Sequence, residues 1–129
     1  MVDEAKQDLS RYRINSALEL INIARLNIDI DAKTAVNRSY YAVLNSMRAV
    51  LALEGYDSKK HSGIISEFRR QYIKTGIFDE KLSVIIKSLF DIRNDCDYED
   101  FFIVSKEDAQ TQLKNAEEFV HAVYKYLKI

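Results

Sequence analysis

Apolar residues recur along most of the chain at steps of three and four positions, the period of an α-helix that packs on one side. This spacing predicts long helices at about residues 3–29, 32–54, 79–98 and from 105 onward, with a short helix at about 61–74. The fold class that follows is all-α: an up-and-down four-helix bundle with one additional short helix, five helices in total. We find no repeat, linker or low-complexity tract in the sequence, so we expect a single domain over residues 1–129.

The inward positions of these helices are almost all aliphatic or aromatic, and we expect them to form the core of the bundle. From the first helix to the last they are Ile14, Ala17, Leu18, Ile21, Ala24 and Ile28; Val36, Tyr40, Val43, Met47, Val50 and Leu51; Ile64, Ile65, Phe68 and Tyr72; Leu82, Ile85, Ile86, Leu89 and Phe90; and Ala109, Leu113, Ala116, Val120, Val123 and Leu127.

Residues suited to helix ends stand where the periodic segments begin and stop. Asp31, Asp79 and Ser105 precede predicted helices and have side chains that accept hydrogen bonds from the first free backbone N–H groups. Gly55 and Gly76 follow predicted helices and permit the left-handed backbone that ends many of them.

Composition narrows the class of protein. The chain has no proline and only three glycines, which disfavours a turn-rich β fold, and its net charge of −1 implies no overall attraction to nucleic acid or membrane. A single cysteine excludes an internal disulfide, and the two histidines belong to no metal-binding motif. We therefore expect no metal and no cofactor. Because the sequence has neither a signal peptide nor an apolar run of about 18 residues, we expect a cytoplasmic protein without membrane association.

An arginine continues the apolar stripe of the fourth helix. The stripe of Leu82 to Phe90, extended by one turn, reaches Arg93 and then Asp97, and a guanidinium on a buried face is costly unless it is paired. The same segment ends in Asp95, Asp97, Glu99 and Asp100, where the helix dipole disfavours negative charge. Such breaks of local folding rules tend to occur at functional sites.

The second helix has a polar face as well as an apolar one. Arg38, Tyr41, Asn45 and Arg48 recur at three- and four-residue steps. This face is either a solvated stripe in which a tyrosine covers the arginine stems, or one side of a groove beside Arg93.

Two further segments have open interpretations. Lys59, Lys60, Arg69, Arg70 and Lys74 make the short helix the most basic part of the chain, either as a solvated face or as a patch for a phosphate backbone. The run 101–104, Phe-Phe-Ile-Val, either closes the end of the bundle or is an apolar surface for a partner.

With these residues identified, the chain resembles the HEPN family (higher eukaryotes and prokaryotes nucleotide-binding domains). The features that carry the resemblance are Asn-Arg-Ser-Tyr-Tyr-Ala at 37–42, Lys-His-Ser-Gly at 60–63, and Arg93-Asn94 followed by Asp97-Tyr98. The resemblance covers nearly the whole chain and implies a homodimer in which the motifs of the fourth helices meet in a shared cleft.

The resemblance also implies two kinds of activity. Many family members are metal-independent ribonucleases, in which an arginine stabilises charge on the scissile phosphate and a nearby histidine moves the proton of the ribose 2′-hydroxyl. Others are partners of a small nucleotidyltransferase in toxin–antitoxin pairs, where a tyrosine near the motif is adenylylated.

The chain departs from the ribonuclease motif. Four residues separate Arg93 from Tyr98, which stands where the motif requires histidine. A phenol is a poor general base at neutral pH, and Asp97 serves only if its pKa is raised. His61 belongs to another segment, and spacing does not decide whether it reaches the same cleft.

We therefore weigh three hypotheses. The first is a homodimer that binds a nucleotide or RNA phosphate through Arg93, Asn94, Arg38, Tyr41, Asn45, Arg48 and His61, as partner of a nucleotidyltransferase. The second is a ribonuclease with Arg93, Asp97 and Tyr98 as candidate catalytic residues, or with His61. The third is a non-catalytic interaction module. Against all three stands a purely structural role for Arg93, paired with Asp97 one turn away or with a carboxylate of a second subunit.

Overall fold

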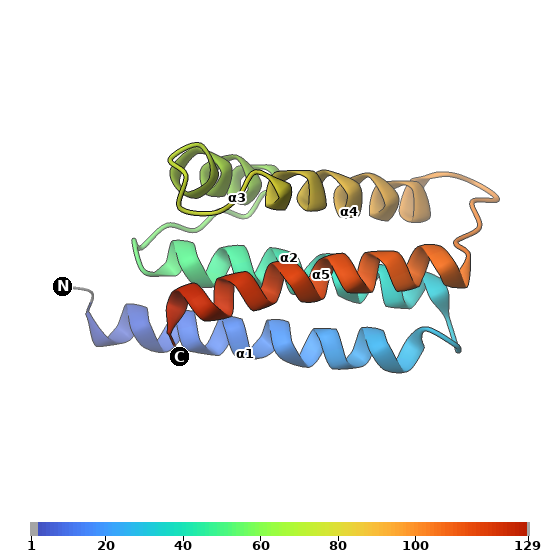
Figure 1. Ribbon diagram of the computed structural model, residues 1–129, viewed down its shortest axis with the longest axis horizontal. Coiled ribbons are helices and arrows are strands. Elements are labelled where there is room, and N and C mark those ends of the chain that lie inside the picture. Colours follow the sequence, from blue (N-terminus) through green and yellow to red (C-terminus); the bar gives the residue numbers. More distant parts are fainter. Residues whose placement is uncertain (1–2, 129) are drawn as a thin grey trace.

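The computed structural model describes residues 3–128 and folds them into a helical bundle, with no strand among those residues (Figure 1). The helices are α1 (Glu4–Asn27), α2 (Ala32–Ala52), α3 (His61–Phe68), α4 (Lys81–Tyr98) and α5 (Lys106–Leu127). The short helix α3 continues into η1 (Arg69–Ile73), a π-helical turn in which the Lys74 N–H bonds to the Arg69 carbonyl. The predicted all-α fold with five helices is confirmed.

The four long helices run alternately in opposite directions, and α3 packs against α2 at one end of the bundle (Figure 1). Helix α2 is the central element, because it packs against α1, α3, α4 and α5. This position explains its composition, since a helix with neighbours on several sides must be apolar over most of its circumference. Thirteen of its 21 residues are buried.

The core lies along the predicted seams. Phe68 is fully buried and its ring lies 5.5–5.6 Å from those of Tyr72, Phe78 and Phe119, which joins α3 and η1 to α5. Leu18, expected in the core, is instead 37% exposed. The buried stripe of α1 is narrower than the predicted one and runs through Ile14, Ala17, Ile21 and Ala24. Removal of a buried ring such as Phe68 costs about 3–5 kcal/mol in comparable cores.

The predicted helix ends are present in the structure. Asp31 Oδ1 accepts a hydrogen bond from the Thr34 N–H, and Ser105 Oγ accepts one from the Asp108 N–H at 2.9 Å. Asp79 accepts the Lys81 N–H at 2.9 Å, although Glu80 is the residue that directly precedes α4. Gly55 and Gly76 both have positive φ.

The run 101–104 divides between the two interpretations. Val104 is buried and Phe102 half-buried against Val36, Ala109 and neighbouring residues, so they close one end of the bundle. Phe101 and Ile103 alternate with them and are 99% and 85% exposed. Neither interpretation therefore describes the whole run.

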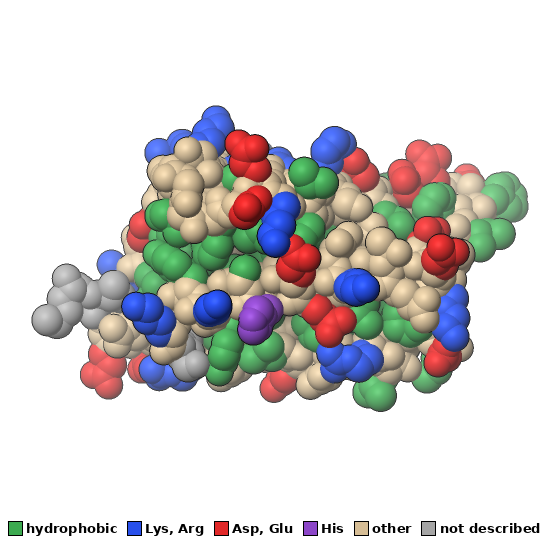
Figure 2. Space-filling model, in the orientation of Figure 1, with side chains coloured by type: hydrophobic (Ala, Val, Ile, Leu, Met, Phe, Trp, Pro, Cys, Tyr) green, Lys and Arg blue, Asp and Glu red, His purple; other side chains and the backbone are tan. Residues whose placement is uncertain are grey.

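Acidic and basic side chains are interspersed on the face seen in Figure 2, so neither sign of charge dominates it. This agrees with a net charge of −1. Among the described residues, no helix is both long enough and apolar enough to cross a membrane.

Candidate functional site

Three helices bring five of the chain's polar and aromatic side chains together. Tyr40 and Tyr41 come from α2, His61 from the first position of α3, and Arg93 and Asp97 from the last turns of α4. We refer to these five residues as the arginine cluster. Both the Arg93 guanidinium and the His61 ring lie within 6 Å of the ring centroids of both tyrosines.

Arg93 is held mainly by the two tyrosines. Its guanidinium carbon lies 5.2 Å from the Tyr40 ring centroid and 5.7 Å from that of Tyr41, and Nη2 donates to the Tyr41 hydroxyl at 3.2 Å. Its side chain is 17% exposed. The rings stabilise the cation and cover the apolar stem, while the side chain keeps a small exposure to solvent. The predicted location of Arg93 on the inward stripe of the helix thus agrees with its burial.

Asp97 provides the carboxylate nearest to Arg93. Its Oδ2 lies 2.9 Å from Arg93 Nε. This is the i, i+4 pair expected if Arg93 has a purely structural role. The Nε atom is buried and has no hydrogen-bond partner of good geometry in the described part of the chain, so the contact is an ion pair without a well-directed N–H···O bond. Such a pair contributes only a few tenths of a kcal/mol. Arg93 can therefore exchange this carboxylate for another anion without leaving the tyrosine rings.

His61 joins the cluster through Tyr40. Its Nδ1 lies 2.9 Å from the Tyr40 hydroxyl, and its ring packs edge-on against Tyr41. Burial lowers the pKa of His61 below its usual value, and the nearby charges of Arg93 and Arg48 lower it further. His61 is therefore neutral at physiological pH.

The Tyr40–His61 hydrogen bond determines what the other imidazole nitrogen offers. Tyr40 is 3% exposed, and burial raises its pKa to about 12, so its hydroxyl keeps its proton. His61 Nδ1 is the hydroxyl's only hydrogen-bond partner among residues 3–128, so its proton has no other acceptor there. A buried donor left unpaired costs about 1–3 kcal/mol. The favoured arrangement is donation from Tyr40 to Nδ1, which places the imidazole proton on Nε2.

Arg48 lies at the edge of the cluster and is engaged elsewhere. Its Nη2 pairs with Asp57 at 3.1 Å, and Arg13 reaches the same carboxylate at 3.3 Å. These arginines, together with the hydrogen bond from the Ser58 N–H, lower the pKa of Asp57 despite its partial burial. Arg48 thus contributes positive potential near His61, and its guanidinium fixes the loop before α3.

The remaining predicted residues are less closely associated with Arg93. Arg38 is exposed, while Asn45 and Asn94 are half-buried without a side-chain hydrogen bond among the described residues. Tyr98 is 76% exposed, one position beyond Asp97. The polar face of α2 therefore meets the cluster mainly through Tyr41. The roles of these residues in binding or catalysis stay predictions.

Tyr40 is a member of the cluster that the spacing assigned only to the core seam. Its ring is indeed buried, but its hydroxyl is directed at His61. The available signal was a phenol in an otherwise aliphatic stripe, because a buried hydroxyl requires a hydrogen-bond partner.

The acidic residues at the end of α4 do not form a ligand set with their neighbours. Within residues 3–128, no group of three or more histidine, cysteine and carboxylate side chains lies close enough to hold a metal ion. The arginine cluster offers different chemistry: a partly exposed guanidinium, a neutral imidazole and two phenol rings. Cationic and N–H donors beside aromatic faces suit a phosphate group and its attached nucleotide.

Comparisons with known proteins agree with this description. A family model described as HEPN domain matches residues 10–127. A UPF0332 protein of Thermotoga maritima is 29% identical over 124 residues, which cover 95% of this chain and 94% of that protein. A UPF0332 protein of Archaeoglobus fulgidus is 32% identical over 114 residues, 88% of this chain and 90% of that protein. A Methanocaldococcus jannaschii protein named "Putative toxin MJ0142" is 32% identical over 93 residues, 72% of this chain and 63% of that protein.

The bundle, its Arg93 motif and the match over residues 10–127 establish that the chain belongs to the HEPN domain family.

Proposed function

We propose that this HEPN protein binds a phosphate of RNA or of a nucleotide at the arginine cluster, as a homodimer with a toxin-type role. The observation that carries the proposal is the position of Arg93 across two tyrosine rings, beside a neutral histidine. A guanidinium stacked on aromatic rings is ordered before any ligand arrives, so little conformational entropy is lost on binding.

The hydrogen-bond arrangement of His61 supports binding over cleavage. With Tyr40 donating to Nδ1, the Nε2 atom carries a proton and acts as a donor, which suits a phosphate oxygen. A general base requires the opposite tautomer, with a free lone pair on Nε2.

A ribonuclease activity is the second candidate, and one observation favours it. His61 comes from α3, yet it reaches the same two tyrosines as Arg93 and has a lowered pKa. In this alternative, His61 replaces the motif histidine that α4 lacks, with the Nδ1 proton donated to the Tyr40 oxygen. Asp97 pairs with Arg93 and Tyr98 is largely exposed, so His61 is the stronger candidate for the base.

The toxin-type role is supported by similarity to proteins named as putative toxins. Partnership with a small nucleotidyltransferase follows from the family resemblance alone, and so does the homodimer. An adjacent gene with a nucleotidyltransferase signature, and co-purification of the two products, is the test of that partnership. The cytoplasmic location stays a prediction.

The binding proposal is tested by fluorescence anisotropy with a short, labelled single-stranded RNA in buffer with EDTA. We expect Arg93→Gln to weaken binding by at least tenfold, since a charge-assisted phosphate contact is lost. Arg11→Gln is the matched control, because Arg11 is exposed on α1 and its ion-pair partner within residues 3–128 is Asp8 alone. Equal affinity of wild type and Arg93→Gln would refute the proposal, and gel analysis of the same mixtures shows whether the RNA is cut.

A further inference from the structure

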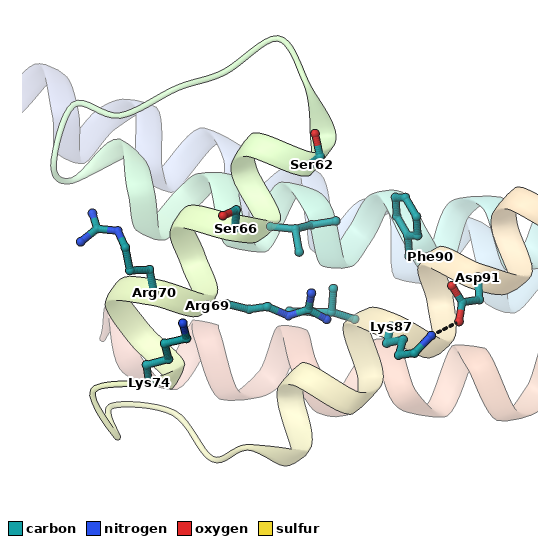
Figure 3. A pocket seen from close by; sticks show the side chains of 10 residues that line it. Ser62, Ser66, Arg69, Arg70, Lys74, Lys87, Phe90 and Asp91 are labelled. Atoms are coloured by element: carbon teal, nitrogen blue, oxygen red, sulfur yellow. Dashed lines mark hydrogen bonds and ion pairs between the residues drawn. The ribbon is translucent and has the colours of Figure 1, made fainter.

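A second feature lies beside the arginine cluster: a groove of about 550 Å³ between α3, η1 and α4 (Figure 3). Its apolar base includes Ile65 and Ile86, and Arg69, Arg70, Lys74 and Lys87 surround it. The volume falls within the range of small-ligand sites, roughly 300–1,000 Å³. We refer to it as the basic groove.

The groove adjoins the cluster at two points. Ser62, which lines the groove, directly follows His61 in the sequence. Phe90 also lines the groove, and its ring centroid lies 6.3 Å from that of Tyr40. A chain molecule bound at Arg93 and His61 is therefore within reach of the groove.

The positive charge in the groove is only partly neutralised. Arg70 pairs with Glu67 and Lys87 pairs with Asp91, and the second of these pairs is drawn in Figure 3. Arg69 differs, because Nε and Nη2 donate to the hydroxyl and carbonyl oxygens of Ser83, which are neutral acceptors. Lys74 forms no ion pair with any residue between 3 and 128. Two cations thus remain without a carboxylate on a chain whose net charge is −1.

Arg69 is also ordered in a manner that suits binding. Its two hydrogen bonds to Ser83, at 2.9 and 3.1 Å, order the guanidinium. Figure 3 shows the Arg69 side chain extending across the groove. The residue begins the π-helical turn η1, and π-helical turns are rare and frequently occur at functional sites. A charged group held by neutral partners keeps its full charge for an anion.

We propose that the basic groove binds the strand of a single-stranded RNA that continues from the phosphate at Arg93. Arg69 and Lys74, which have no carboxylate partner within residues 3–128, contact backbone phosphates, Lys87 exchanges Asp91 for a third phosphate, and Phe90 stacks on a base. Positive groups that follow the backbone, combined with an aromatic platform, are the usual means of binding single strands without sequence preference. This inference rests on the proposed function, because it extends the ligand of the same site.

The test compares labelled oligouridylate binding by wild type and by the double variant Lys74→Gln/Lys87→Gln. Both lysines are exposed, so the variant is expected to fold. Each phosphate contact on a single strand contributes about 0.7 to the slope of log affinity against log salt. We therefore expect the slope to fall by about 1.4 in the double variant, with affinity at least tenfold weaker at low salt.

The matched control is Lys33→Gln/Lys114→Gln, which removes the same charge from exposed positions outside the groove. It is expected to keep the wild-type salt slope and an affinity within about twofold of wild type. Phe90→Leu is expected to weaken binding several-fold without changing the salt slope, because stacking is not an ionic contact. Thermal melts of each variant confirm that it is folded.

Several results separate this inference from the proposed function. If wild type binds RNA through Arg93 but the groove variant and the control behave alike, the groove inference is wrong and the proposed function stands. If uridine monophosphate binds as tightly as the oligonucleotide, or if the groove variant changes the oligomeric state, the groove is not a strand-binding surface. Loss of affinity and slope in the groove variant alone supports it.

Discussion

The Tyr40 hydroxyl and His61 Nδ1 lie 2.9 Å apart and join the centre of α2 to the start of α3. The contact orients an imidazole whose own helix is only eight residues long. The position of the imidazole proton also separates the two candidate functions. If Tyr40 donates to Nδ1, Nε2 carries the proton and can donate to a phosphate; if Nδ1 donates to Tyr40, Nε2 has a free lone pair and can act as a base.

The first prediction concerns that proton. We expect the ¹⁵N chemical shifts of His61 at pH 7.5 to report a neutral ring with the proton on Nε2. In Tyr40→Phe the two tautomers are expected to mix, because the hydrogen bond that selects one of them is gone. A ring with its proton on Nδ1 in wild type would instead favour the ribonuclease candidate.

The second prediction concerns pH and stability. Burial, aided by Arg93 and Arg48, lowers the pKa of His61 below 6.5, so below that pH the unfolded chain binds more protons at this residue than the folded one. The contribution of His61 therefore makes the protein less stable as pH falls from 6.5 to the folded-state pKa. Above pH 6.5 it has no such effect.

The measurement is urea unfolding of wild type and His61→Gln between pH 7.5 and 5.5. The free energy of unfolding of the variant is expected to fall less over this interval. His121→Gln is the control, because His121 is exposed on α5. A parallel pH dependence for wild type and His61→Gln would show that the His61 pKa is not lowered.

The third prediction concerns Asp97, whose carboxylate competes with a phosphate for Arg93. Asp97→Asn keeps the shape of the side chain and removes the charge next to Nε. We expect RNA affinity to rise roughly threefold to tenfold, consistent with the loss of one nearby negative charge. Glu99→Gln, an equal charge change two residues away, is expected to have a much smaller effect. If Arg93 is only structural, both variants bind alike.

The fourth prediction concerns the proposed homodimer. A cleft shared by two α4 helices places Tyr98, 76% exposed in the single chain, at the contact between subunits. Light scattering is expected to give twice the chain mass for wild type and a shift toward monomer for Tyr98→Glu. Tyr12→Glu changes a tyrosine that is 71% exposed on α1 and is expected to remain dimeric. A monomeric wild type at micromolar concentration would contradict the dimer.

The sequence was informative about the fold because each helix shows its own period. The seam from Val36 to Leu51 and the caps at Asp31 and Ser105 are local features, and local features are what spacing can reveal. The burial of Leu18 was misjudged because the width of a buried stripe depends on the neighbouring helices.

The site was only partly predictable for a related reason. Arg93 could be predicted because it interrupts the apolar stripe of its own helix, and Tyr41 because it lies on the polar face of α2. The meeting of His61 with Tyr40 depends on how α3 crosses α2, which no spacing along the chain encodes. The engagement of Arg48 by Asp57, a loop residue, is likewise a tertiary contact.

The most direct test of the account is an NMR titration of wild type with short single-stranded RNA, observing the Arg93 Nε–Hε signal and the His61 ring nitrogens. We predict that both signals shift together, with the dissociation constant that anisotropy gives for the same RNA. If the RNA binds to saturation while the Arg93 and His61 signals stay in place, the arginine cluster is not the phosphate site.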